Sequence, residues 1–288
     1  MNVTNVHRWA VILGASTGVG GAIARAVARD PGLDVFGVHR GHYPDDARRV
    51  EEDVQAAGRR VVLHMADAGT AAGARTCAAV FKELAGERTL GLFVHSISGA
   101  SLGRFLPTHG DAFSPRQVEK TFDYLAHSFT YWAQALYDLD LLAPGARLVG
   151  LTNVLHDSLL NNTGLVAAAK AALQMYVRHL AIELGPLGHR VNLLKFGTII
   201  TPAVRAVMGP EALARLEAIH RQLIPAGRIG AADDVARFVS ILAREETHWL
   251  NGATIDFTGG MMLRLLDVVL QPDSSHLQHA KGRPGSRS

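Results

Sequence analysis

Short apolar runs alternate with longer segments of helical spacing along most of the chain. Apolar runs bounded by turn residues are typical of buried strands, whereas apolar positions three and four apart indicate helices. The runs that predict strands are 9–13, 34–39, 60–65, 90–96, 147–152, 190–196 and 254–257. The segments that predict helices are 19–30, 45–57, 73–84, 115–142, 165–184 and 233–243. This alternation predicts an α/β fold with a doubly wound parallel sheet of about seven strands, covered by helices on both faces.

The pattern also predicts how the chain is divided. No linker rich in proline or glycine and no fixed repeat interrupts it, so we expect one domain over residues 1–270. Within it, 201–223 is a long excursion with a helical centre, placed where a lid over a substrate could lie. Residues 271–288 are polar, and we expect them to be disordered.

Composition narrows the class of protein. The chain has 288 residues, 48% of them hydrophobic, and a formal charge of +3, of which much lies in the polar tail. Charges elsewhere are mixed in sign, which argues against a nucleic-acid surface. The 9–13 run is far too short for a membrane span.

The single cysteine, Cys77, excludes an internal disulfide and favours a cytoplasmic protein, and its place on an apolar helix face predicts a core thiol. No histidine pair with an acidic partner has zinc-site spacing, so no metal is expected.

A glycine-rich loop joins the first predicted strand to the first helix, reading Gly14-Ala-Ser-Thr-Gly18-Val-Gly20-Gly21. Glycines let the backbone turn sharply and approach a pyrophosphate, while the helix N-terminus supplies free N–H groups. The alternative is a plain turn between strand and helix. The position at the start of an alternating α/β chain favours a dinucleotide site, for which we predict Gly14, Ser16, Thr17, Gly18, Val19 and Gly20.

The second predicted strand ends in Val38-His39-Arg40. An NAD site usually places an acid there for the ribose 2′-hydroxyl, and here a cation follows instead. Arg40 suits a 2′-phosphate because a guanidinium offers planar bidentate donors, the alternative being a solvated loop arginine. The expected cofactor is therefore NADP(H), with NAD(H) the weaker choice.

With these motifs the sequence resembles the short-chain dehydrogenase/reductase family over about residues 9–262, which implies the Rossmann fold. Further stretches carry the resemblance: Arg190-Val-Asn, Arg228-Ile-Gly, Asp233-Asp-Val-Ala and Asn251-Gly. The resemblance implies cofactor contacts from Asp67, Ser96, Ile97, Gly197, Ile199 and Thr201. Val94-His95-Ser96-Ile97 and His127-Ser128-Phe129 are similar to the enoyl-thioester reductase branch, although the glycine loop is of the general type.

The same resemblance identifies Lys170 as the family lysine, which holds the nicotinamide ribose, and it shows where the pattern breaks. The family tyrosine stands four residues before the lysine, or seven in enoyl reductases, where this chain has Val166 and Thr163. Asn153 replaces a serine or a second tyrosine, and Leu125 replaces an asparagine of the fourth helix. Catalysis is therefore assigned to Lys170, Asn153 and Thr163, with His156 as a further candidate beside Asp157. A helix N-cap for Thr163 and a turn for Asn153 are the alternatives.

A threonine hydroxyl ionises too weakly to protonate an alkoxide, whereas reduction of a conjugated alkene needs only donors around an enolate oxygen. The sequence thus predicts an NADPH-dependent reductase of an activated alkene, an enoyl thioester or a polyketide-like enone, acting on a small molecule. Two alternatives stay open: a catalytically silent NADP(H)-binding protein, and a lyase or isomerase that reuses the pocket. The resemblance also implies a homodimer or homotetramer formed through 115–142 and 165–184. Tyr124, Tyr131 and Tyr137 are expected in core or subunit contacts.

Overall fold

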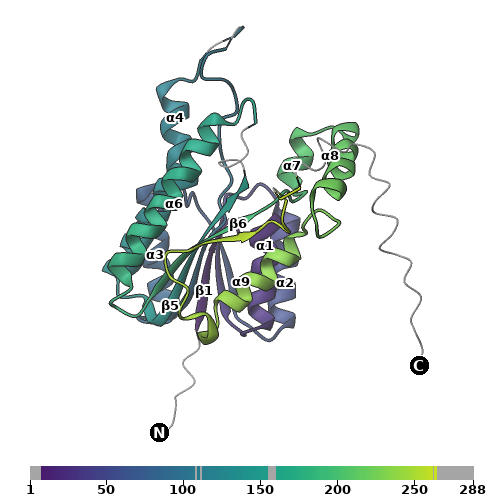
Figure 1. The fold of residues 1–288 in the computed structure, drawn as a ribbon. Coiled ribbons are helices and arrows are strands. Elements are labelled where there is room, and N and C mark those ends of the chain that lie inside the picture. The colour runs from purple at the N-terminus through teal and green to yellow at the C-terminus, as the bar shows by residue number, and fades with distance from the viewer. Residues whose placement is uncertain (1–7, 108, 111, 155–159, 262, 265–288) are drawn as a thin grey trace, which may run out of the picture.

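A parallel seven-stranded sheet forms the centre of the protein, in a computed structural model that describes residues 8–107, 109–110, 112–154, 160–261 and 263–264. The strands lie in the order β3-β2-β1-β4-β5-β6-β7 (Figure 1). Their bounds are β1 Trp9–Leu13, β2 Asp34–His39, β3 Val61–Met65, β4 Leu90–His95, β5 Leu142–Asn153, β6 Arg190–Phe196 and β7 Thr254–Phe257. Since β1 lies between β2 and β4, the order reverses there, and ligands bind at such a switch point in open α/β sheets.

Helices cover both faces of the sheet, and each face has its own apolar core (Figure 1). One face carries α1 Gly18–Arg29, α2 Pro44–Ala56 and α9 Ala232–Leu242. The other carries α3 Ala71–Ala85, α4 Pro115–Phe122, α5 Ser128–Asp138 and α6 Gly164–Leu184. Two further helices, α7 Pro202–Val207 and α8 Pro210–Leu223, lie beyond the carboxyl ends of the strands. Burial of both faces explains why the strands read as nearly continuous apolar runs.

The predicted doubly wound parallel sheet is confirmed, and so is the burial of Cys77. The predicted helix 115–142 is wrong in two respects. A π-helical turn, Asp123–His127, separates α4 from α5, and α5 ends at Asp138, so that residue 142 already begins β5. Asp140 has a left-handed backbone, which stops the helix, while the buried leucines 141 and 142 continue the apolar pattern into the strand. The tail 271–288 lies outside the described residues.

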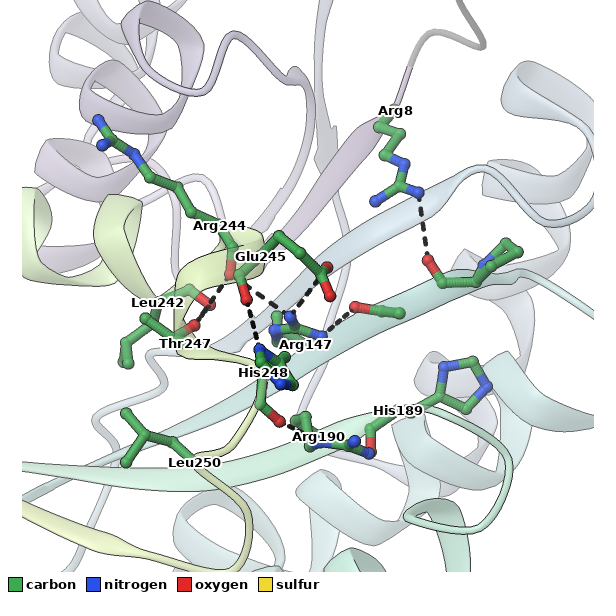
Figure 2. Close-up of polar contacts among 12 residues, drawn as sticks. Arg8, Arg147, His189, Arg190, Leu242, Arg244, Glu245, Thr247, His248 and Leu250 are labelled. Carbon is green, nitrogen blue, oxygen red and sulfur yellow. Dashed lines mark hydrogen bonds and ion pairs between the residues drawn. The ribbon is translucent and has the colours of Figure 1, made fainter. Parts of the chain in front are cut away.

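A buried arginine ties the amino-terminal edge of the sheet to the loop after α9. Arg147 of β5 donates hydrogen bonds to the carbonyl oxygens of Gly145 and Arg244 and lies 3.5 Å from the Glu245 carboxylate (Figure 2). The Arg147 side chain is almost fully buried, whereas that of Glu245 is 83% exposed. Burial lowers the pKa of Arg147 below its ordinary value. The carbonyl contacts, rather than the exposed ion pair, should therefore provide most of what this arginine contributes.

We expect Arg147→Met to lower the free energy of unfolding by about 1–3 kcal/mol, because two partly buried carbonyl oxygens lose their donor. Glu245→Gln should cost less than about 0.5 kcal/mol, since an exposed ion pair contributes little. Urea denaturation of both variants measures the difference. Equal losses would mean that the ion pair dominates.

Candidate functional site

The glycine loop lies at the switch point, where the ends of β1 and β4 meet. Gly14 has a left-handed backbone, and a Cβ atom there would lie 2.4 Å from the carbonyl oxygen of Ser96. A Cβ atom on Gly20 would lie 2.2 Å from the carbonyl oxygen of Gly14. Both positions therefore require glycine, and together they let α1 start directly above the end of β1.

The first turn of α1 has the donors that a phosphate needs. Thr17 occupies the N-cap position, yet its side chain makes no capping hydrogen bond and its hydroxyl instead donates to Asp46 over 2.9 Å. The helix therefore begins without the side-chain acceptor that usually satisfies its first N–H groups. Gly18, with a left-handed backbone, faces the Thr201 side chain, which lies 3.8 Å from a Cβ atom built there. Free N–H groups in the first turn of α1, next to a glycine that has no side chain to block a ligand, fit a pyrophosphate.

The segment after β6 faces this loop. Ile199 is buried and forms an isolated bridge with Gly230, while the hydroxyl oxygen of Thr201 accepts a hydrogen bond from the Val204 N–H at the start of α7. Gly197 packs against residues 258 and 261. The structure thus brings Thr201 next to Gly18 and places Gly197 and Ile199 on the same segment.

A hydrogen-bonded pair that sequence reasoning missed joins this segment to α8. The hydroxyl of Thr198 lies 2.8 Å from Nε2 of His220, and Nδ1 of His220 lies 2.7 Å from the Leu216 carbonyl oxygen. Because a carbonyl can only accept, Nδ1 carries the proton and Nε2 accepts from the threonine hydroxyl. The pair fastens the predicted lid segment to the end of β6. Residues 22 positions apart in the sequence leave no pattern that would have indicated it.

Arg40, after β2, and Asp67, after β3, both contact one tyrosine, Tyr124. Tyr124, in the π-helical turn, is 5% exposed and donates its hydroxyl hydrogen to Asp67. The guanidinium carbon of exposed Arg40 lies 5.1 Å from the centroid of the Tyr124 ring. Burial and the neighbouring Asp67 raise the pKa of Tyr124, so it stays a neutral donor. Tyr124 was expected in a core or subunit contact, and the structure places it between two predicted cofactor residues.

Lys170 is buried on α6 beside the end of β5. Its ammonium donates to the Leu151 carbonyl oxygen over 2.8 Å. Within the described part of the chain this is the only hydrogen bond of Lys170 that we observe, and an ammonium has three donors. Burial lowers its pKa to about 8. A cation with spare donors at the carboxyl edge of the sheet fits the hydroxyls of a bound ribose.

Apolar side chains fill the two positions at which the resemblance expects an asparagine and a tyrosine. Leu125 and Val166 are buried and pack together with Ala169 in one cluster, with Phe122 against it. Val166 lies four residues before Lys170 on α6, so the cluster and the lysine share one side of the helix. No ionisable group stands at either position.

The remaining predicted residues are less clearly placed at a site. Asn153 ends β5 in register with Phe196 of β6, so it is not a turn residue. Thr163 stands at the N-cap position of α6, but its hydroxyl donates to the Leu160 carbonyl oxygen over 2.8 Å and does not cap the helix. To donate to a substrate it must give up that bond. His156 and Asp157 lie outside the described residues.

His95, at the end of β4, is held as a neutral ring. It is fully buried, its Nε2 lies 2.7 Å from the Ser128 hydroxyl, and its Nδ1 has no hydrogen-bond partner among the described residues. The Ser128 hydroxyl donates to the Tyr124 carbonyl oxygen, so Nε2 of His95 carries the proton. Burial, and then the nearby Lys170 charge, lower its pKa to about 3. His95 therefore supports the strand end and is not a general acid at neutral pH.

Comparisons with known proteins agree with this architecture. The family model described as enoyl-(acyl carrier protein) reductase matches residues 14–262. An uncharacterized oxidoreductase of Mycobacterium tuberculosis is 30% identical over 92% of this chain and 95% of its own length. The 1-cyclohexenylcarbonyl-CoA reductase of Streptomyces collinus is 25% identical, covering 88% of this chain and 86% of its own. The structure of a Burkholderia cenocepacia short-chain dehydrogenase in complex with NADP, 27% identical, superimposes with a TM-score of 0.73 over 88% of this chain and 98% of that one.

The glycine contacts give a test of the site. We expect Gly20→Ala to weaken binding of an adenine dinucleotide by more than about tenfold, because its methyl group displaces the Gly14 backbone. Gly58→Ala, at a left-handed position with open space around it, should cost about 1 kcal/mol of stability and leave binding unchanged. Calorimetric titration and thermal melting separate the two effects. Normal binding by the Gly20 variant would exclude this loop as the phosphate site.

Proposed function

Because the chain belongs to the short-chain dehydrogenase/reductase family of oxidoreductases, we propose that it is an NADPH-dependent reductase of an activated alkene. The substrate class is a carbon–carbon double bond conjugated to a carbonyl, as in an enoyl thioester or a polyketide-like enone.

One observation carries the choice of an alkene over a ketone. Leu125 and Val166 pack into an apolar cluster beside Lys170, at the positions where the family resemblance expects polar groups. Reduction of a simple ketone needs a proton for the alkoxide, and these side chains hold none. Hydride addition to a conjugated alkene forms a delocalised enolate, which requires only hydrogen-bond donors and takes its proton afterwards from water. The name of the Streptomyces relative, whose substrate carries a ring double bond next to the thioester carbonyl, supports the same class.

The residues that would hold the cofactor follow from the site. The first turn of α1 would bind the pyrophosphate, Arg40 the 2′-phosphate, and Lys170 the nicotinamide ribose. When bound, NADPH supplies the hydride. The chain's own part is to orient the two reactants and to stabilise the enolate oxygen, with Lys170 acting through the ribose hydroxyl. Asn153 and Thr163 are proposed as further donors at that oxygen, and Thr163 exchanges its bond to Leu160 for the substrate.

The outer surface of α6 supports a further proposal, that the protein works as a homodimer or homotetramer. Met175 is 49% exposed and Ile182 is 70% exposed, and a spacing of seven residues places them on one face of the helix. Covering them would remove apolar surface from water. A monomer in sedimentation velocity at micromolar concentration would contradict this.

Within the described part of the chain no helix has the length and apolarity of a membrane span, and a cytoplasmic location is proposed from the single buried cysteine.

The proposed function is tested by turnover. With NADPH, conjugated enoyl thioesters should be reduced and simple ketones should not, as followed by the loss of NADPH absorbance and by product mass. NADPH should bind at least about tenfold more tightly than NADH, a difference of about 1.4 kcal/mol. Efficient reduction of ketones would show that a proton donor exists, with His156 the first to examine. Binding of NADPH without turnover of any enone favours the silent binder, and conversion without consumption of NADPH favours a lyase or isomerase.

A second test concerns Lys170. Its pKa of about 8 means that the ammonium is present below pH 8 and lost above it. We expect the rate at saturating NADPH to be constant from pH 6 to 7.5 and to fall above pH 8. Lys170→Met should lower the rate roughly 10²–10³-fold, as removal of one preorganised donor does. Lys82→Met is the control, because it removes a partly exposed lysine of α3 that pairs with Glu87. It should change neither the rate at saturating NADPH nor its dependence on pH.

The lowered pKa of Lys170 also predicts how the stability difference between the native chain and Lys170→Met changes with pH. Since the folded pKa of Lys170 lies below its ordinary 10.5, the folded state binds fewer protons between about pH 8 and 10.5. The native chain should therefore gain stability relative to Lys170→Met as the pH rises through that window. A difference that is independent of pH would show that the lysine is not buried as a cation.

A further inference from the structure

Two cations, Arg40 and Lys120, lie over one tyrosine ring at the end of β2. The guanidinium carbon of Arg40 is 5.1 Å from the centroid of the Tyr124 ring, and Nζ of Lys120 is 5.7 Å from the same centroid. Neither forms an ion pair with any described residue. Lys120 belongs to α4, far from Arg40 in the sequence, so the fold and not the local chain brings the two charges together.

The ring between them is held firmly. A Cβ atom on Gly69 would lie 2.9–3.0 Å from three atoms of the Tyr124 ring, so the backbone of Gly69 covers one face. A Cβ atom on Gly99 would lie 3.1 Å from the ring edge, and the hydroxyl is bound to Asp67. Tyr124 thus forms a fixed platform, and the two cations lie over what remains of its surface.

The charges around the platform are unbalanced. The Asp67 carboxylate beside the ring accepts hydrogen bonds from the Tyr124 hydroxyl and from the Gly69 N–H. Cation–π attraction at exposed positions is worth about 0.5–1 kcal/mol, which does little to offset the repulsion between two neighbouring cations. Arg40 and Lys120 together exceed the single charge of Asp67, so the cluster keeps a net positive charge that a phosphate anion would offset and a neutral ribose hydroxyl would not.

We propose that Lys120 is a second phosphate-binding residue, which together with Arg40 binds the 2′-phosphomonoester of the cofactor's adenosine, and that Tyr124 is the positioning residue for both. This rests on the proposed function and extends it, because the phosphate site then spans β2 and α4. Arg40 supplies the planar fork of donors and Lys120 a mobile point charge. Recognition by both elements makes the preference for NADP(H) depend on the packing of α4 against the sheet.

The test uses the adenosine half of the cofactor alone. Calorimetric titration with 2′,5′-ADP and with 5′-AMP isolates the 2′-phosphate from the nicotinamide and from turnover. Lys120→Gln should weaken 2′,5′-ADP binding about tenfold, the size of one charge-assisted contact, and leave 5′-AMP binding unchanged. The affinity of the Lys120→Gln variant for 2′,5′-ADP should also decrease less steeply with salt concentration than that of the native chain. Tyr124→Phe, which keeps the ring under both cations, should keep more of the selectivity than Tyr124→Leu, which removes the ring.

A matched control removes the same charge from the same helix. Arg116, one turn before Lys120, is exposed, and Arg116→Gln should leave both affinities unchanged. Equal losses in the Arg116 and Lys120 variants would overturn the proposal in favour of a general effect of net charge. Selective binding of 2′,5′-ADP that survives Lys120→Gln would overturn it while the NADP(H) assignment stands. Absence of selectivity for 2′,5′-ADP in the native chain would instead overturn the assignment to NADP(H).

Discussion

The close approach of Gly14 to Ser96, where β1 meets β4, sets the geometry of the whole carboxyl edge. A single Cβ atom at Gly14 would displace the end of β4, and one at Gly20 would displace Gly14 itself. Because this contact is tight, α1 begins directly above the sheet and its N-terminus faces the edge where the strands end. Everything assigned to the cofactor is placed relative to that one contact. At the opposite, amino-terminal edge of the sheet, Arg147 holds the loop after α9 through hydrogen bonds to carbonyl oxygens.

The burial of Lys170 costs free energy in this arrangement. Burying an ammonium is unfavourable, and the lowered pKa is the measure of that cost. Such a cation persists in a fold when it has a task, and the apolar cluster beside it indicates which task is left. With Leu125 and Val166 at the polar positions of the family, the lysine has no acidic side chain there to assist. In the proposed function it orients the ribose and stabilises the negative charge of an enolate, whereas an alkoxide would also need a proton donor.

Most of the fold could be predicted from the sequence because periodicity reports burial, and buried strands and amphipathic helices differ in period. The failure at 115–142 has the same origin. Leu141 is buried directly before β5 and Leu142 is buried as its first residue, and nothing in their spacing distinguishes this from one more helical turn. The site was predictable where one local motif builds it, as in the glycine loop. It was not predictable where residues distant in sequence meet, as Thr198 does with His220 and Arg40 with Tyr124.

The π-helical turn Asp123–His127 connects the two ends of the site. Adjacent residues of a helix point about 100° apart, so Tyr124 and Leu125 cannot serve the same partner. Tyr124 lies against Asp67 and Arg40, at the proposed adenosine end, and Leu125 packs with Val166, in the turn before Lys170, at the proposed hydride end. A π turn adds a residue to the helical repeat and changes which side chains face each direction, and such turns are frequent at functional sites. One widened turn therefore carries residues of both the cation platform and the apolar cluster, so the proposed cofactor preference and the proposed reaction class depend on the same piece of backbone.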